Sequence, residues 1–226
     1  MKMTTLYIVA TPIGNLKDIT LRALEVLKSV DLILCEDTRV TQKLLLKYEI
    51  EKPLWSYHQH SRLNKIEQII NELSLGKNIA LVSDAGTPGI SDPGGILIQA
   101  IYEKLGNDVK IVPIPGPNAA ISALSISGFP ADNFRFLGFP PHKKGRKTFF
   151  EKISRIEETV VFYESKYRIE KTLLELEKTI GNRQIIVCRE LTKQFETIYR
   201  GAAKECLEKL RKDKILGEFV IVIRAI

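Results

Sequence analysis

Three features of the sequence predict an α/β fold. Short runs rich in β-branched and aliphatic residues recur along the 226 residues, and each has the length of a buried strand. Segments with apolar residues at helical spacing lie between these runs, as in strand-helix-strand crossovers. Loops rich in glycine and proline follow several of the runs, which is typical of connections that leave the ends of strands.

The first half of the chain predicts an alternation of strands and helices. Residues 6–10 form a continuous apolar run and are predicted as a buried strand. Asp18 is expected to cap the helix that follows, and residues 31–35 to form the next strand. The later elements predicted are helices at 38–47, 64–73 and 94–105 and strands at 79–83 and 109–114.

A cluster of proline and glycine at residues 115–117 marks a predicted domain junction. The chain is therefore divided into an N-terminal α/β domain, residues 1–116, and a C-terminal α/β domain, residues 117–226. The second domain begins with a helix of small residues at 119–127, stopped by Gly128-Phe129-Pro130. The segment 134–137 follows without an assigned element. Further strands are predicted at 159–163, 184–189 and 219–223, with helices around Ile169, Leu173 and Leu176 and around Leu207 and Leu210.

The composition is that of a globular protein from a reducing compartment. With 44% hydrophobic and 27% charged residues, the chain is neither fibrous nor disordered. Its three cysteines, Cys35, Cys188 and Cys206, lie far apart and are odd in number, which argues against disulfides and favours the cytoplasm. The apolar run near residue 10 is too short for a secretory leader, and no stretch reaches the roughly 20 apolar residues of a membrane span.

Three loops that follow predicted strands are the candidate ligand site: residues 11–15, 83–94 and 115–119. In an open parallel sheet, ligands bind where loops leave the carboxyl ends of the strands. Glycine lets the backbone approach a ligand closely, and proline fixes the loop shape in advance. The loop 83–94 is longer than a simple connection needs, so we interpret it as functional rather than as a tight turn.

Several ligand classes lack their motifs in this sequence. It contains neither the glycine fingerprint of a dinucleotide fold, nor a P-loop, nor the serine elbow of a hydrolase. His58 and His60 lie two residues apart, but no third ligand completes a metal site with them. We therefore expect no metal and no ordinary hydrolase chemistry.

Several segments together carry a resemblance to a known family. They are residues 6–15, 17–20, 35–39 (Cys-Glu-Asp-Thr-Arg), 82–94, 113–120, 163–165 (Tyr-Glu-Ser) and 189–193 (Arg-Glu-Leu-Thr-Lys). In this order they resemble the ribosomal RNA small subunit methyltransferase I family, whose members are similar to the tetrapyrrole methylases. The segments 83–94 and 36–39 are the most specific.

The resemblance implies a fold, a cofactor and a reaction. The fold is a two-domain, tetrapyrrole-methylase-like (class III methyltransferase) α/β fold that binds S-adenosylmethionine in the cleft between the domains. The reaction is 2′-O-methylation of a cytidine ribose in 16S rRNA, free or within the small ribosomal subunit, by a homodimer. The donor site carried over comprises Ile13, Gly86, Thr87, Ile90, Ser91, Gly116, Pro117 and Asn118 from the three loops and Tyr163, Glu190, Leu191 and Phe219 from the second domain.

Methyl transfer to a ribose hydroxyl requires a group that takes the hydroxyl proton. Asp37 is the first candidate for this base, because it lies in a polar turn after a buried strand, and Glu36 and Lys193 are alternatives. An equally good interpretation is that Asp37 caps the helix 38–47.

A cationic segment at residues 142–147 and a net charge of +7 favour contact with RNA phosphates. The candidate RNA-binding residues are Lys143, Lys144, Arg146 and Lys147, together with Arg39. The alternative is a solvated run of charges before an amphipathic helix. Phe149 and Phe150, which follow this run, are expected to pack in the core.

Two other functions remain open at the level of sequence. One is a methyltransferase of the same fold that acts on a tetrapyrrole, another small molecule or a protein. The first loop argues against a tetrapyrrole, because residues 10–15 (Ala-Thr-Pro-Ile-Gly-Asn) replace the glycine-rich stretch of the cobalamin-pathway enzymes. The other is a non-enzymatic RNA-binding protein. Members of the resembled family commonly have a further small C-terminal domain, so RNA contacts by such a domain are not expected of these 226 residues.

Overall fold

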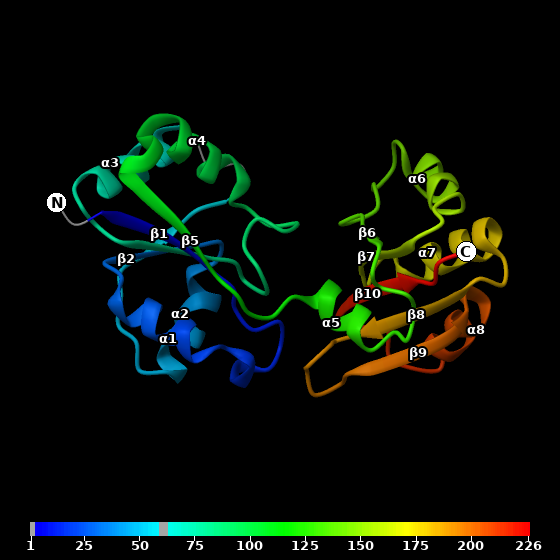
Figure 1. Cartoon of the computed structure of the whole chain (residues 1–226). Helices are drawn as coiled ribbons and strands as arrows, with labels where there is room; N and C mark the ends of the chain where they lie inside the picture. Colours follow the sequence, from blue (N-terminus) through cyan, green and yellow to red (C-terminus); the bar gives the residue numbers. More distant parts are fainter. Residues whose placement is uncertain (1–2, 59–62) are drawn as a thin grey trace. The chain divides into compact units, whose positions relative to one another are not determined.

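The computed structural model describes residues 3–58 and 63–226, and Figure 1 shows the course of the chain. The chain divides into two compact units, Met1–Asn118 and Ala119–Ile226. Each unit contains its own five-stranded sheet and its own hydrophobic core.

The first unit is built on five parallel strands in the order β3-β2-β4-β1-β5. The strands are β1 (Thr4–Val9), β2 (Leu32–Cys35), β3 (Leu54–Ser56), β4 (Ile79–Val82) and β5 (Val109–Ile114). Strands β2 and β4 are buried along their whole length, which explains their uninterrupted apolar sequences. Because all five strands run in the same direction, their carboxyl ends lie along one edge of the sheet.

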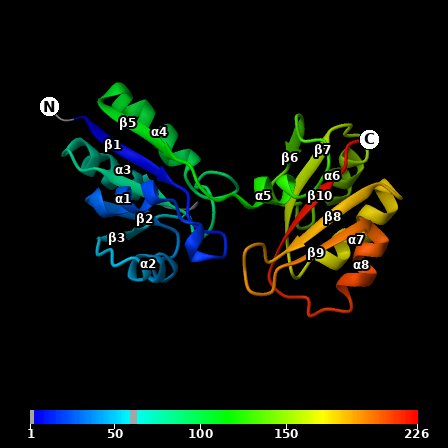
Figure 2. The ribbon, with the colours of Figure 1, turned by 60° about the horizontal axis from the view of Figure 1, so that its bottom comes forward.

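Helices cover both faces of this sheet (Figures 1 and 2). The helices are α1 (Leu21–Ser29), α2 (Thr38–Lys47), α3 (Leu63–Ser74) and α4 (Gly95–Leu105). One core cluster joins α1 and α2 to the sheet, and another joins α3 and α4 to the opposite face. This is the two-sided arrangement that strand-helix-strand crossovers produce.

The start of α1 differs from the sequence-based expectation. Asp18 ends a 3-10 turn, Leu16–Asp18, and does not cap the helix. The cap is Thr20, whose hydroxyl oxygen accepts a hydrogen bond of 3.1 Å from the Ala23 backbone N–H. The prediction placed the cap at Asp18 because aspartate and threonine are both good capping residues, and only the backbone path distinguishes them.

The second unit begins with α5 (Ala119–Ser125) and contains a mixed sheet in the order β6-β7-β10-β8-β9. The strands are β6 (Phe134–Phe136), β7 (Thr159–Ser165), β8 (Gln184–Arg189), β9 (Thr197–Ala202) and β10 (Glu218–Ile223). Strand β6 pairs parallel with β7, and every other neighbouring pair is antiparallel. The unit is therefore α/β, but its sheet is mixed, whereas the sheet of the first unit is entirely parallel.

Three helices pack on one face of the second sheet: α6 (Arg146–Ile153), α7 (Ile169–Ile180) and α8 (Ala203–Leu210). Their core includes Phe150, which is 2% exposed, as expected from the sequence. Phe149 is partly buried and packs against the same core. Figure 2 shows α7 and α8 beside β8 and β9.

The predicted α/β fold class is confirmed, and the sequence-based elements are found in the expected order. Three strands were not predicted, β3, β6 and β9. Each lies at a sheet edge, so none has the continuous apolar sequence of a central strand. Among the described residues, no helix combines the length and apolar character needed to cross a bilayer.

Candidate functional site

The loops after β1, β4 and β5 leave the same edge of the first sheet, where the three strands are neighbours. Strand β1 lies between β4 and β5, so the loop 11–15 lies between the loops 83–94 and 115–118. In open parallel sheets, this edge is where ligands bind. The three loops predicted from the sequence as a ligand site thus come from adjacent strands of one unit.

Backbone hydrogen bonds join the first loop to the central loop. Thr11 and Gly86 form an isolated antiparallel bridge, with N···O distances of 2.9 and 3.1 Å. The Thr11 hydroxyl also donates to the Ser83 carbonyl at 3.0 Å, and both of these side chains are buried. Thr11 and Ser83 were not predicted to hold these loops together. The available signal was a hydroxyl residue shortly after each apolar strand.

The third loop joins the same cluster at two points. The Thr87 hydroxyl donates to the Pro117 carbonyl at 3.3 Å. Gly116 lies so close to the first loop that a β-carbon added there would be 2.9 Å from the Ala10 β-carbon. Because real β-carbons do not approach one another so closely, only glycine fits at position 116 without displacement of its neighbours.

The predicted donor-site residues of the first unit therefore lie on connected loops. Ile13 is buried, and its side chain lies close to Gly86, where an added β-carbon would be 3.5 Å from it. Ile90 and Ser91 are exposed on the central loop. Ser91 has a φ of +62°, in the left-handed region that a serine rarely adopts. Such backbone strain costs about 1–3 kcal/mol and is common at ligand sites.

Asp37 caps α2 in the structure. Its carboxylate accepts a hydrogen bond of 2.8 Å from the Arg39 backbone N–H, and the Arg39 guanidinium lies 2.6 Å from the other carboxylate oxygen. These hydrogen bonds lower the pKa of Asp37 to about 2. A carboxylate with so low a pKa is a weak base, so the capping interpretation describes this side chain best.

Glu36 has a different environment from Asp37. Burial raises the pKa of the Glu36 carboxyl, and the nearby charge of Asp84 raises it further. Asp84 belongs to the central loop and accepts a hydrogen bond of 3.0 Å from the Asp37 backbone N–H. The loop after β2 is therefore tied to the loop 83–94, and Glu36 is the more basic of its two carboxylates.

Lys193 is paired with two carboxylates in the second unit. Its ammonium group lies 2.8 Å from Glu190 and 3.0 Å from Glu218. Burial disfavours the charged form of Lys193, but the hydrogen bonds to these two carboxylates outweigh burial and raise its pKa. The side chain is therefore protonated near neutral pH and does not accept a proton there.

The other predicted donor-site residues of the second unit differ in exposure. Phe219 is 1% exposed within the core, and Leu191 is 8% exposed, so the bulk of each side chain is packed inside the unit. Tyr163 is half-buried, and its hydroxyl accepts a hydrogen bond of 3.3 Å from the Ala120 backbone N–H. Glu190 has a φ of +52° and receives a hydrogen bond from the Glu218 backbone.

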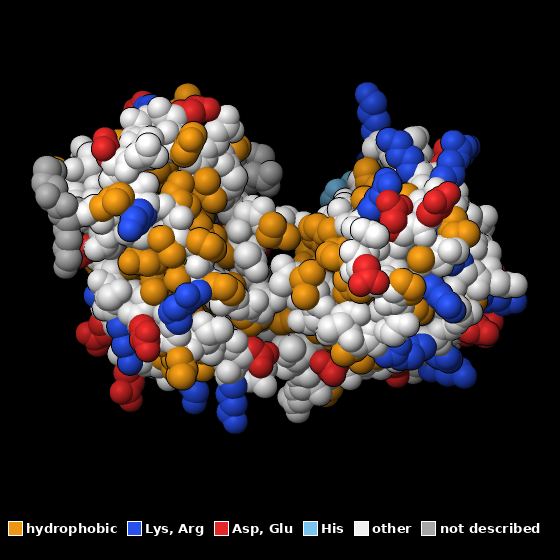
Figure 3. Space-filling model, viewed as in Figure 1, with side chains coloured by type: hydrophobic (Ala, Val, Ile, Leu, Met, Phe, Trp, Pro, Cys, Tyr) orange, Lys and Arg blue, Asp and Glu red, His pale blue; other side chains and the backbone are white. Residues whose placement is uncertain are grey.

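The cationic segment, residues 142–147, runs into the start of α6 and contains one residue that does not face solvent. Lys143, Lys144 and Lys147 are exposed, and Figure 3 shows Lys and Arg side chains gathered on the surface over α6. Arg146 is only 4% exposed and is not available to bind RNA in this structure, contrary to the expectation from the sequence. The reason is its position as the first residue of α6, where its side chain turns inward.

Three side chains hold Arg146 in place: its guanidinium lies 2.8 Å from the Glu175 carboxylate, donates to the Thr172 hydroxyl at 2.7 Å, and lies near the buried carboxylate of Glu164. Glu164 on β7 is 1% exposed and lies 3.5 Å from the Arg146 guanidinium and 2.9 Å from that of Arg168. The two guanidinium groups donate to successive carbonyls, those of Pro141 at 3.3 Å and Pro140 at 2.9 Å. Through these two arginines, Glu164 holds residues 140–141 in place, directly before the segment that carries the exposed lysines.

Within the described ranges, no three His, Cys, Asp or Glu side chains are grouped to hold a metal ion. His58 contacts the Ser56 hydroxyl at 2.7 Å. His60, the other histidine of the pair considered above, lies outside the described residues.

Comparison with family models and with known proteins gives consistent matches. The model of the Tetrapyrrole (Corrin/Porphyrin) Methylases matches residues 5–207. The chain is 47% identical over 222 residues to the Bacillus subtilis protein named ribosomal RNA small subunit methyltransferase I, covering 98% of this chain and 75% of that protein. It is 44% identical over 221 residues to the Thermotoga maritima protein of the same name, covering 98% of both.

Solved structures share the fold at low sequence identity. A cobalt precorrin-4 methyltransferase of cobalamin biosynthesis superposes with a TM-score of 0.71 and 20% identity, covering 97% of this chain and 94% of that one. A diphthine synthase gives a TM-score of 0.72 and 14% identity, covering 98% and 90%. At these identities, the match concerns the fold alone.

Proposed function

The chain belongs to the ribosomal RNA small subunit methyltransferase I family, within the tetrapyrrole methylases, and we propose that it methylates the 2′-hydroxyl of a cytidine in 16S rRNA. S-adenosylmethionine is the methyl donor. The observation that carries this proposal is the 44–47% identity, over nearly the whole chain, to relatives with this name. A match of this length includes both the connected loops of the first unit and the cationic segment of the second.

The donor site is proposed on the loops of the first unit. Their connected backbone, with glycine at positions 86 and 116, suits a ligand held largely through backbone groups. The resemblance adds Asn118 to this set and Tyr163, Glu190, Leu191 and Phe219 from the second domain. The proposed domains, residues 1–116 and 117–226, differ by two residues at their boundary from the compact units Met1–Asn118 and Ala119–Ile226.

The proposed reaction is an in-line displacement, in which alignment of the reacting atoms is the main requirement. When bound, S-adenosylmethionine supplies a methyl group activated by a sulfonium. We assign the role of base to Glu36, because its raised pKa makes it a stronger base than Asp37, and Lys193 is protonated. The Glu36 carboxylate takes the proton of the 2′-hydroxyl while the oxygen forms its bond to the methyl carbon and the carbon–sulfur bond breaks.

RNA contact is proposed through Lys143, Lys144 and Lys147, whose ammonium groups are exposed. Arg39 is 86% exposed and can contact a phosphate as well, although its guanidinium also pairs with Asp37. The resemblance further favours a homodimer and a location in the cytoplasm. The substrate is either free 16S rRNA or the small ribosomal subunit.

Two measurements test this proposal. Calorimetric titration with S-adenosylmethionine should give saturable binding, and the absence of heat at millimolar ligand would leave only a non-enzymatic RNA-binding protein. Incubation with tritium-labelled donor and either free 16S rRNA or small subunits should place label in RNA. Label in neither RNA, despite donor binding, would favour a small-molecule or protein substrate instead.

A further inference from the structure

A pocket of about 480 Å³ lies in the second unit beside the edge strand β6, outside every loop discussed above. It is formed by β6 and the residue after it, by α6, and by the segment 155–158 that leads into β7. The volume lies in the range of small-ligand sites. None of its residues belongs to the proposed donor site or to the exposed lysines 143, 144 and 147.

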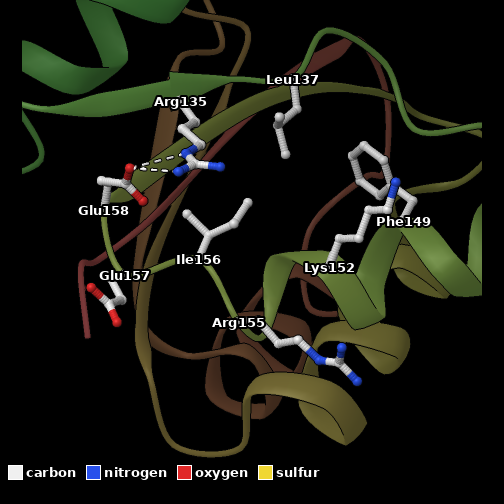
Figure 4. Close-up of a pocket in the computed structure, with 8 residues that line it drawn as sticks. All are labelled: Arg135, Leu137, Phe149, Lys152, Arg155, Ile156, Glu157 and Glu158. Carbon is white, nitrogen blue, oxygen red and sulfur yellow. Dashed lines mark hydrogen bonds and ion pairs between the residues drawn. The ribbon is translucent and has the colours of Figure 1, made fainter.

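The inner wall of this pocket is apolar. Leu137 and Ile156 point toward one another across it, and the ring of Phe149 closes one side (Figure 4). Phe149 is held by edge-on contacts with Phe150 and Phe162, at centroid distances of 5.3 and 5.9 Å. A fixed aromatic ring beside two aliphatic side chains is a surface on which a planar base can rest.

The rim of the pocket is charged, with an excess of cations. Arg135 donates two hydrogen bonds to Glu158, at 2.7 and 3.1 Å, so these charges compensate each other. Lys152 and Arg155 are exposed, and within the described part of the chain neither is paired with a carboxylate. The remaining carboxylate, Glu157, lines the side away from Lys152 in Figure 4.

The segment that forms the lower rim is held in place by the rest of the unit. Arg183 donates to the carbonyls of Ile153 at 3.4 Å and Glu158 at 3.2 Å. The Ile226 backbone N–H donates to the Glu157 carbonyl at 2.9 Å. Because both ends of the segment are fixed, a ligand does not have to order it on binding.

We infer that this pocket binds one unpaired nucleotide of the RNA substrate, other than the cytidine that is methylated. The base lies against Leu137, Phe149 and Ile156, and its phosphate contacts Lys152 and Arg155. This combination of an aromatic platform and backbone-tracking cations is how proteins bind single-stranded nucleic acid without sequence preference. The inference rests on the proposed function, which supplies the RNA.

The first test is a pair of charge reversals measured by fluorescence anisotropy with a fluorescein-labelled oligouridylate. Lys152→Glu with Arg155→Glu should weaken binding at least tenfold. It should also reduce the slope of log Kd against log salt by about 0.7, the value for one phosphate contact to a single strand. The matched control is Lys204→Glu with Lys212→Glu, which makes the same change in net charge at two exposed residues away from the pocket. Equal losses in the two double variants would overturn the inference.

A second test reports on the pocket itself. The chain has a single tryptophan, Trp55, in the first unit, so Phe149→Trp in a Trp55→Phe background places the only indole in the pocket. Oligouridylate should quench its fluorescence over the same concentrations that raise the anisotropy. Binding without quenching would overturn the inference. A chain that binds in this way but transfers no methyl group to RNA would refute the proposed function and leave the pocket assignment standing.

Discussion

The Arg146 guanidinium lies 3.5 Å from the Glu164 carboxylate, and the two side chains are 4% and 1% exposed. Removal of one partner of a buried ion pair costs about 3–5 kcal/mol, because the other charge stays buried. We expect Arg146→Ala to lower the free energy of unfolding by about 3 kcal/mol, the lower end of this range. The reason is that Arg168 remains 2.9 Å from Glu164, while Glu175, which lies 2.8 Å from Arg146, is partly exposed to water. Urea unfolding measures this change.

Lys147 provides the matched control for that prediction. It is the next residue along α6, its side chain is 91% exposed, and its one ion pair among the described residues is a 3.7 Å contact with Glu151. Lys147→Ala should change the stability by less than about 0.5 kcal/mol, as surface substitutions do. Similar costs for the two alanine variants would show that Arg146 does not form the buried pair described here.

Gly116→Ala should weaken the binding of S-adenosylmethionine. The added methyl group would be 2.9 Å from the Ala10 β-carbon and would separate the first loop from the third. Overpacking of this kind costs about 1–3 kcal/mol, so calorimetry should show a Kd raised by about tenfold or more. Gly95→Ala is the control, since a β-carbon there meets nothing within 4 Å. Unchanged donor affinity in Gly116→Ala would separate these loops from the donor site.

Glu36→Gln should remove the pH dependence of turnover on the acid side. A general base must be ionised, so the activity of the unmodified enzyme should fall as the pH falls through the Glu36 pKa, which burial raises above its usual range. Glutamine cannot take the proton, and we expect kcat to fall by about 10²–10⁴-fold with donor affinity unchanged.

Asp37→Asn distinguishes the two neighbouring carboxylates. Asparagine is also a good helix cap, so this variant should keep α2 and most of the turnover. Loss of turnover in Asp37→Asn, with activity retained in Glu36→Gln, would return the role of base to Asp37. The pH profile of the rate should be measured for both variants.

Replacement of Lys143, Lys144 and Lys147 together by alanine should weaken RNA binding to a similar extent for all sequences. Three lost phosphate contacts reduce the salt slope of log Kd by about 2 for a single strand. Calorimetry should find the affinity for S-adenosylmethionine unaltered, because the change is confined to the cationic segment. RNA affinity equal to that of the unchanged protein would show that these lysines form only a solvated charge run.

The three cysteines should be unreactive in the folded protein. All are buried, and burial raises the pKa of the Cys188 thiol to about 12 and that of Cys206 to about 11. Because the pKa values in the folded state lie above the ordinary value of about 9, burial of the neutral thiols contributes fully to the free energy of unfolding below that pH. This contribution is lost as the pH rises through the folded pKa values of about 11 for Cys206 and about 12 for Cys188. A thiol-specific chromogenic reagent at neutral pH should label no cysteine without denaturant and all three in urea.

Much of the fold was predictable because its central strands are buried on both faces. Strands β2 and β4 have no polar residue to interrupt the apolar run, so their sequences identify them directly. Edge strands lack this signal. Strand β9 carries the exposed Arg200 and the half-buried Gly201, and only its pairing with β8 identifies it as a strand.

The candidate site was predictable where backbone geometry decides it. Glycine and proline in the three loops indicated that the loop backbones approach one another closely. Of the glycines in these loops, Gly116 makes the tightest approach, to Ala10. The cationic segment was less informative, because Arg146 and its lysine neighbours look alike in the sequence. Only the fold brings Glu164 of β7 to Arg146, 18 positions earlier in the chain, and turns that side chain inward.

The most direct test of the account is a map of ribose methylation in 16S rRNA. Small subunits from a strain that lacks this protein should be incubated with the purified chain and S-adenosylmethionine, and the rRNA digested and analysed by mass spectrometry. The account predicts one new 2′-O-methylcytidine that Glu36→Gln fails to produce. An rRNA methylation pattern that is the same with and without the active chain would contradict it.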